Sequence, residues 1–249
     1  MKETKHQFPT EEVTLPSKGL LYPKESPLNK GVIDMKYMTA REEDILTNTN
    51  LIENGTVIDK LLQSLIITPI DYNELLLGDK NAVLIASRIL GYGKDYEFDY
   101  KGENQKIDLT EVEDKSIDDS LIKEGKNNFH FTLPTSKVDI TFKLLTHGDE
   151  KAITNELKGL KRINKNVAAE LSTRMKYIIT SINGDSEKKT IREFVDNQLL
   201  AIDARALRNY VVEIQPDINL TFEYEDRNGD FVKVPIPINL NFFWPDTEL

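Results

Sequence analysis

The chain contains one residue pattern twice, and each copy runs from a helix into an alternating, aromatic hairpin. The segment Leu75–Asp79 aligns with Leu199–Asp203 without a gap, at an offset of 124 residues. The same offset superimposes three alternating positions of each copy, placing Tyr96, Phe98 and Tyr100 on Leu220, Phe222 and Tyr224. A repeat of this length indicates two similar folding units, because the helix period and the strand period recur in the same order.

The repeat extends upstream at shorter offsets. Ile33–Thr39 aligns with Ile140–Thr146, and an acidic pair follows each segment. Leu15-Pro16 likewise aligns with Leu133-Pro134. We therefore expect an α+β fold built by tandem duplication of a strand–helices–β-hairpin unit, with two packed, pseudo-equivalent halves.

Breaks in composition divide the chain into five parts. Four prolines keep the first part from forming a helix, and a polar, charged stretch separates the two units. The expected parts are an extended N-terminal arm (1–30), a first α+β unit (31–113), a linker (114–128), a second α+β unit (129–240) and an aromatic C-terminal tail (241–249).

Charge and cysteine usage exclude several classes of function. The net charge of −10 and the pI of about 5.0 disfavour sequence-independent binding of phosphate backbones. The densest basic run, Lys158–Lys165, is predicted to be a solvated helix face or a patch for an acidic protein partner. The absence of cysteine excludes disulfides, thiolate catalysis and cysteine-bound metal. The first ten residues lack the apolar core of a signal peptide, so we expect the protein to stay where it is made.

Local signals predict how several helices begin and end. Thr39 and Glu42 have the spacing of a capping box, and Asp79 and Asp203 are expected to be N-caps. The helix after Asp79 should end at Gly91 and Gly93. In the second half, apolar residues predict one long helix over 168–182.

Residues of catalytic type are present, but their spacing does not indicate a reaction. The acidic clusters at 42–44 and 118–119 would form acid–base or metal sites only if their carboxylates faced one another and were buried. Charge at a helix start explains the first cluster, and Asp79 and Asp203 are interpreted as caps. Gly91-Tyr92-Gly93 follows a helix instead of opening one, so it is a helix stop and not a phosphate loop. The three histidines, expected at exposed or strand-edge positions, are His6, His130 and His147.

The aromatic run Phe242, Phe243 and Trp244 leaves two interpretations open. These rings either pack on the chain's own core or form a docking plug for a partner, and they are the candidate partner-binding residues. On the second interpretation, deleting the chain from Phe242 onward weakens partner capture more than it unfolds the protein.

Several separated motifs, in this order, resemble the baseplate hub assembly protein family of T-even-like contractile-tailed bacteriophages. They are Leu15–Pro23, Met38–Leu46, Leu75–Ala86 with Arg88–Gly93, and Phe242–Pro245. The resemblance spans nearly the whole chain. It implies a late protein that acts in the host cell cytoplasm, or is retained in the virion baseplate, and it brings no catalytic residues. Some relatives carry Cys pairs at the two hairpin tips, which suggests zinc knuckles there. This chain has Lys101–Asn104 and Asp226–Gly229 instead, so no metal or other cofactor is implied.

The leading hypothesis is a non-enzymatic assembly factor that promotes hub assembly by binding other hub proteins or the tape-measure protein, without nucleic acid or membrane. The faint similarity of the layout to tail assembly chaperones agrees with this. The first alternative is a permanent structural subunit of the mature baseplate. The second is a peptidoglycan-cleaving enzyme that uses Glu42, Asp79 or Asp203.

Overall fold

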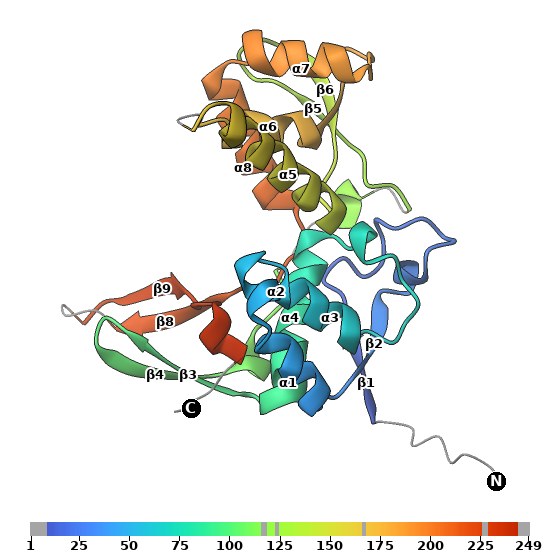
Figure 1. The fold of residues 1–249 in the computed structure, drawn as a ribbon. Coiled ribbons are helices and arrows are strands. Elements are labelled where there is room, and N and C mark those ends of the chain that lie inside the picture. Colours follow the sequence, from blue (N-terminus) through green and yellow to red (C-terminus); the bar gives the residue numbers. More distant parts are fainter. Residues whose placement is uncertain (1–8, 116–118, 123–124, 166–167, 226–228, 244–249) are drawn as a thin grey trace.

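The structure is a computed structural model that describes residues 9–115, 119–122, 125–165, 168–225 and 229–243. It is an α+β fold in which helices surround small antiparallel sheets (Figure 1). Short 3-10 turns connect several of the larger elements, at η1 (Pro27–Lys30), η2 (Tyr72–Glu74), η3 (Leu109–Glu111), η4 (Asp119–Leu121) and η5 (Leu240–Phe243).

The first half begins with two antiparallel strands and continues with four helices. Strand β1 (Thr10–Thr14) pairs with β2 (Val32–Lys36). The helices that follow are α1 (Ala40–Leu46), α2 (Thr49–Glu53), α3 (Val57–Leu65) and α4 (Leu77–Tyr92). After α3, Ile66 forms an antiparallel bridge to Met35 on β2, so the chain returns to the strand from which the helices departed.

The second half has a three-stranded antiparallel sheet with β6 in the centre and four helices against it. The strands are β5 (Phe129–Thr132), β6 (Asp139–Phe142) and β7 (Ile179–Ile182). The helices are α5 (His147–Ile163), α6 (Glu170–Ile178), α7 (Lys188–Asn197) and α8 (Ala201–Ile214). In Figure 1 these elements form an upper lobe above the first half.

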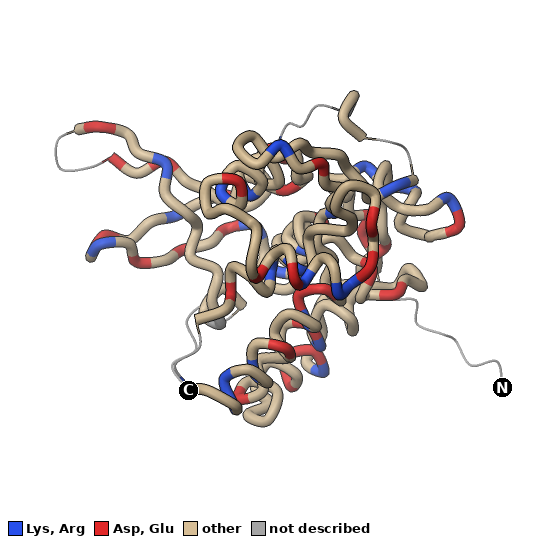
Figure 2. The backbone as a smooth tube through the Cα atoms, turned by 90° about the horizontal axis from the view of Figure 1, so that it is seen from above, with Lys and Arg blue, Asp and Glu red and all other residues tan. Residues whose placement is uncertain are grey.

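Each half ends in a hairpin, and the two hairpins lie side by side on the lower lobe (Figures 1 and 2). The first is β3 (Asp95–Tyr100) with β4 (Glu103–Asp108), and the second is β8 (Thr221–Glu225) with β9 (Phe231–Pro235). Edge-to-face contacts join them, with ring centroids 5.0 Å apart for Phe98 and Phe222. At the tip of the first hairpin, the Lys101 ammonium lies 5.2 Å from the ring centroids of both Tyr100 and Tyr224. A cation–π contact therefore links the two hairpins at the tip of the first one.

Aligned residues of the two halves make the same contacts. The expected capping box is present, because the Glu42 carboxylate accepts from the Thr39 backbone N–H at 3.0 Å and from its hydroxyl at 2.6 Å. A second box at Thr146 has Asp149 in the same role. In each half a lysine at the end of the preceding strand, or directly after it, also pairs with the capping carboxylate. The pairs are Lys36–Glu42 at 2.8 Å and Lys143–Asp149 at 2.7 Å.

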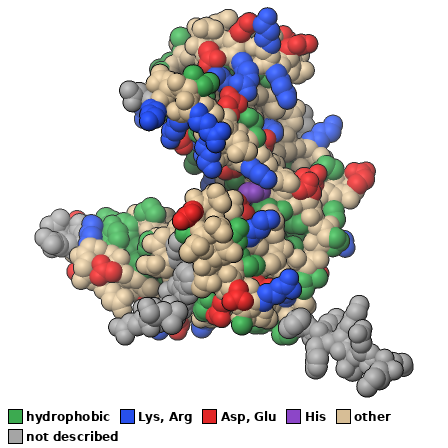
Figure 3. Space-filling model, viewed as in Figure 1, with side chains coloured by type: hydrophobic (Ala, Val, Ile, Leu, Met, Phe, Trp, Pro, Cys, Tyr) green, Lys and Arg blue, Asp and Glu red, His purple; other side chains and the backbone are tan. Residues whose placement is uncertain are grey.

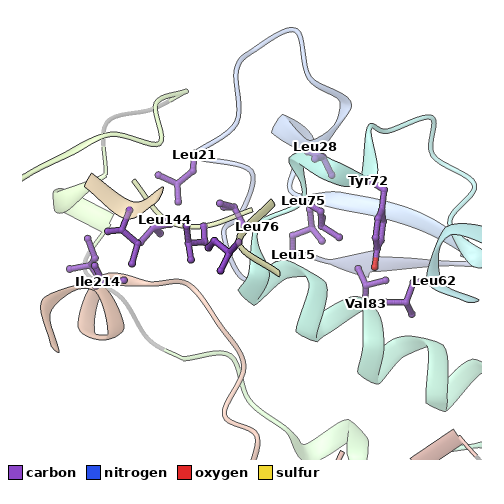
Figure 4. Close-up of a cluster of buried hydrophobic side chains, with 14 of the residues drawn as sticks. Leu15, Leu21, Leu28, Leu62, Tyr72, Leu75, Leu76, Val83, Leu144 and Ile214 are labelled. Atoms are coloured by element: carbon purple, nitrogen blue, oxygen red, sulfur yellow. The ribbon is translucent and has the colours of Figure 1, made fainter. Parts of the chain in front are cut away.

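One hydrophobic core runs through both halves. Figure 4 shows Leu144 and Ile214 of the second half next to Leu21 and Leu76, from which the cluster continues into the first half. Backbone hydrogen bonds reinforce this junction, since the Leu77 N–H donates to Leu145 and the His147 N–H donates to Leu75. The halves therefore have a fixed mutual arrangement, supported by continuous burial of apolar surface.

The segment expected to be an N-terminal arm belongs to the first half wherever it is described. It supplies β1 and fully buried side chains, including Leu15 and Leu28. The expected linker also pairs, because Asp114 bridges to Ile218 between the two hairpins.

Three element boundaries differ from those expected. The predicted helix over 168–182 is α6 followed by strand β7, because Ile179–Ile182, in which three of four residues are β-branched, leaves the helix to pair with β6. The apolar spacing over 57–66, with Pro69 behind it, predicts a helix that runs up to the proline. Helix α3 ends at Leu65 instead, because Ile66 bonds to β2. Gly91 lies inside α4, and Gly93 alone ends the helix, with φ of +84°.

Candidate functional site

A hollow separates the upper lobe from the hairpins of the lower lobe (Figure 3). Lys and Arg side chains gather on its upper wall, over α5, and hydrophobic side chains gather on its lower wall, over the hairpin β8–β9. We take this hollow as the candidate functional site because its walls carry exposed charge and exposed apolar surface that the fold does not cover.

The upper wall is formed by a row of cations on α5. Lys151, Lys158 and Arg162 recur at i, i+7 and i+11, a spacing that puts them on one side of a helix. With Lys161 and Lys165 they form what we call the basic face. All five side chains are exposed, and the row from Lys151 to Arg162 is about 17 Å long at 1.5 Å per helical residue.

The cations of the basic face have no ion-pair partner among the described residues, whereas several basic side chains of α6 and α7 are paired. Arg174 is held by Glu150 at 2.7 Å, and Arg192 by Glu156 at 2.8 Å. Residues 147–214 contain 12 Lys and Arg against 10 Asp and Glu, whereas the whole chain contains 32 against 42. Positive charge is therefore concentrated on one lobe of an acidic protein. The run Lys158–Lys165 lies on a solvated helix face, as one of its two predicted interpretations required.

Apolar side chains border the basic face where α5 passes to α6. Ile163, the last residue of α5, is 86% exposed, and Leu171 near the start of α6 is 60% exposed. Strand β9 belongs to the hairpin that borders the hollow from below, and its Phe231 is 71% exposed. Its strand pairs with β8, whose own aromatic residues face the first hairpin, so nothing in the described chain covers the Phe231 ring.

Between the lobes lies a cluster of titratable side chains that the sequence analysis did not find. The Lys80 ammonium is 2.6 Å from Asp59 and 3.3 Å from Nδ1 of His147, and the Tyr72 hydroxyl donates to Asp59 at 3.2 Å. Burial and the neighbouring Lys80 lower the pKa of His147, which keeps the imidazole neutral. The cluster joins α3, α4 and α5 across the junction of the halves. His147 is buried, so its predicted exposed or strand-edge position is wrong.

Asp79 and Asp203 are not the N-caps that the sequence predicted. The caps of α4 and α8 are Leu76 and Leu200, and both carboxylates lie one turn later. Asp79 accepts from the backbone and hydroxyl of Ser17 and, at 2.6 Å, from the hydroxyl of Tyr22. Both aspartates therefore tie the loop after the first strand of their half to the last helix of that half.

The partners of Asp203 are backbone groups, and the two carboxylates titrate differently. Asp203 accepts from the backbone N–H groups of Thr135 and Ser136 at 2.8 and 2.9 Å. Burial raises the pKa of Asp79 to about 6 despite its hydrogen bonds. Burial also acts on Asp203, but the hydrogen bonds from Ser136 and Thr135 outweigh it and lower the pKa.

The remaining candidate residues do not come together. The Glu42 carboxylate is buried in the capping box, where hydrogen bonds from Lys36 and Thr39 outweigh burial and lower its pKa. His130 is exposed on β5, 3.8 Å from Asp139, while His6 and Asp118 lie outside the described residues. In the part of the chain that the structure describes, no three His, Asp or Glu residues are grouped for a metal ion. Within that part, no helix has both the length and the apolar character needed to cross a bilayer.

The described rings of the C-terminal aromatic run are in the core. Phe242 and Phe243 are 0% exposed, and Phe242 packs edge-on against Tyr96 with ring centroids 4.8 Å apart. Phe242 and Phe243 therefore pack on the chain's own core, which is the first of the two interpretations. Trp244 lies outside the described residues.

Comparisons of this chain with protein-family models, with curated proteins and with solved structures gave no match.

Proposed function

We propose that this chain is a non-enzymatic phage tail assembly factor, which promotes assembly of the baseplate central hub by binding other hub proteins or the tape-measure protein. The observation that carries the proposal is the hollow, whose two walls expose cationic and apolar side chains toward the same space (Figure 3). The resemblance of the separated sequence motifs to the hub assembly family supports the same function.

The exposed apolar residues favour binding over solvation. Phe231 alone offers a large ring, and burying an aromatic side chain removes roughly 150–250 Å² from water. A partner segment in the hollow would contact both walls at once. Once the partner has bound one wall, its contact with the other wall forms within the same complex. The apparent affinity for the partner is therefore higher than either contact alone would give.

We also infer that the two halves arose by duplication of one strand–helices–hairpin unit. The matching capping boxes with their paired lysines support this, as do the carboxylates of Asp79 and Asp203, which bond to corresponding loops. Residues that align in the sequence thus make equivalent contacts. The halves differ on their outer surfaces, since the basic face lies only on the second, so the inferred copies have separate roles in binding.

The positions of the acidic residues agree with a binding protein. Asp79, Asp203 and Glu42, the residues that a peptidoglycan-cleaving enzyme would use, hold loops and a helix start through short hydrogen bonds. The proposed site of action is the cytoplasm of the infected host late in infection. Retention as a permanent baseplate subunit is the competing role.

The test combines reconstitution with analysis of particles. The chain is co-expressed with each hub protein and with the tape-measure protein of its phage, and complexes are measured by size-exclusion chromatography with light scattering. We expect a stable complex with one of them, whose formation Phe231→Ala weakens. If none of these proteins binds, the proposal is wrong.

Mass spectrometry of purified mature particles then separates the two roles. Absence from particles despite strong expression identifies an assembly factor, whereas stoichiometric copies identify a structural subunit. Tails that assemble normally when the gene is deleted would contradict both roles.

A further inference from the structure

We propose that the basic face, with Ile163 and Leu171 beside it, is the docking site for an acidic amphipathic helix of a partner protein. This inference rests on the function proposed above and specifies the chemistry of the partner. The observation behind it is a row of five exposed cations without ion-pair partners, next to two exposed aliphatic side chains.

Charge determines the sign of the partner. Several cations of this lobe are matched within the fold, as in Lys176–Asp196 at 2.7 Å and Arg174–Glu150 at 2.7 Å. The basic face has no such match among the described residues, although the chain as a whole carries a net charge of −10. An acidic segment supplies the missing carboxylates, and its attraction to the row both orients and accelerates association.

The aliphatic side chains favour a protein over a nucleic acid. Ile163 and Leu171 are 86% and 60% exposed, and a phosphate backbone would leave both in water. Single-stranded nucleic acids also need exposed rings on which bases stack. The tyrosine of these two helices, Tyr177, is partly buried and donates its hydroxyl to Glu156 at 3.1 Å.

The geometry of the face fits a helix. The cations extend for about 17 Å along α5, which an antiparallel helix of about 11 residues spans at the same rise. The aliphatic pair lies at one end, where α5 passes to α6. A helix with acidic residues on one side and apolar residues at the border of that side would cover both features together, in the helix-on-helix mode common in peptide recognition.

The experiment measures binding of a defined probe to the whole chain. The probe is a fluorescein-labelled peptide of about 18 residues, in which Glu and Leu are placed at helical spacing. Its control has Gln in place of every Glu. We expect fluorescence anisotropy to show saturable binding of the acidic peptide, weakening about tenfold between about 50 and 300 mM salt, and little binding of the control.

Two matched variants locate the site. Lys158→Gln with Arg162→Gln removes two charges from the basic face, and Lys188→Gln with Lys189→Gln removes two exposed charges from α7 of the same lobe. We expect the first pair to weaken peptide binding by about fivefold or more and the second by less than twofold. Ile163→Ser with Leu171→Ser should also weaken binding, by about tenfold. Circular dichroism checks that each variant keeps its helical content.

Other outcomes overturn the proposal. Equal losses in the two charge variants would mean that the peptide responds only to the overall charge of the lobe. Tighter binding of a DNA oligonucleotide of equal charge, unaffected by the Ile163 and Leu171 substitutions, would identify a phosphate site. A dimer in sedimentation velocity that Lys158→Gln with Arg162→Gln dissolves would identify a second copy of this chain as the occupant.

The two proposals fail separately. If a hub or tape-measure protein binds and the Lys158→Gln, Arg162→Gln variant binds it equally well, the basic face is not its docking site, while the assembly function stands. If the acidic peptide binds at the basic face but no tail protein does, the function is wrong and the docking chemistry stands.

Discussion

The carboxylate of Asp79 accepts two hydrogen bonds from Ser17, one from the backbone N–H at 2.9 Å and one from the hydroxyl at 2.7 Å. These bonds connect the loop after β1 to helix α4 across 62 residues of sequence. The carboxylate is fully buried, and Asp203 makes the related contact in the second half. The two aspartates therefore provide a matched pair for measuring what these links contribute.

Replacing Asp79 with Asn should remove a pH dependence of stability. The folded-state pKa of about 6 lies above the ordinary value of 3.8, so the folded protein holds this proton more tightly than the unfolded chain does. The contribution of Asp79 to stability is therefore present below about pH 4 and is lost as pH rises through 6. Relative to the wild type, the Asn variant should gain on the order of 2–3 kcal/mol in unfolding free energy from pH 4 to pH 7. Urea titrations at several pH values measure this, and parallel curves for the two proteins would contradict it.

Asp203→Asn should show the opposite sign. The folded-state pKa of Asp203 is lowered, so its contribution to stability is present above the ordinary value and is lost as pH falls through the folded-state pKa. In the Asn variant, an amide NH₂ group replaces one carboxylate oxygen and faces the backbone N–H of Thr135 or Ser136. Two donors then face each other, and one hydrogen bond is lost. We expect a lower urea midpoint than the wild type at pH 7, with the difference shrinking below about pH 4. A midpoint equal to that of the wild type at pH 7 would mean that this link contributes little.

Much of the local structure was predictable because its causes lie close together in the sequence. The alternation Tyr96, Phe98, Tyr100 predicts β3 correctly, and the Thr39–Glu42 spacing predicts the first capping box. The partner of Asp79 could not be predicted this way. An aspartate three residues into a helix pattern looks like a cap, and Ser17 becomes its partner only through the tertiary fold.

The candidate site was predictable only in part. The run Lys158–Lys165 indicates a charged helix face from its spacing alone. The face borders a hollow only because of how the two lobes meet, with Leu75–Leu77 against Leu145–His147. No periodicity in the sequence predicts that contact. The burial of His147 has the same origin. Strand β7 was missed because a segment rich in β-branched residues, such as Ile179–Ile182, continues a helical pattern and also suits a strand.

Gly78→Ala should destabilise the protein more than any ordinary surface substitution. A methyl group at this position would overlap the carbonyl oxygen of Pro216, which lies after α8 and packs on the first turn of α4. Backbone must move to relieve the overlap, and we expect a loss of about 1–3 kcal/mol or more.

Gly159→Ala is the matched control for Gly78→Ala. It also lies in a helix, α5, but a methyl group there meets no atom within 4 Å. Alanine should therefore stabilise the protein by about 0.5–1 kcal/mol, the usual gain over glycine within a helix. Chemical denaturation of both variants measures the difference, and equal effects would mean that the Pro216 contact is not tight in solution.

Two Phe→Ala substitutions separate core packing from partner binding. Phe242 is fully buried against Tyr96 and Phe243, so Phe242→Ala should lower the unfolding free energy by about 3–5 kcal/mol. Phe231 is 71% exposed on β9, so Phe231→Ala should stay within about 0.5 kcal/mol of the wild type. Thermal melts and capture of the proposed tail partner are measured on the same samples. We expect Phe231→Ala to weaken capture with an unchanged melting temperature, because the ring is exposed on β9, in the hairpin that borders the hollow. Phe242→Ala should lower both, because its ring supports the hairpins from inside.

Deleting the chain from Phe242 onward should act as Phe242→Ala does and lower both the melting temperature and capture. Normal stability with lost capture in that deletion would instead restore the docking-plug interpretation of the C-terminal aromatic residues.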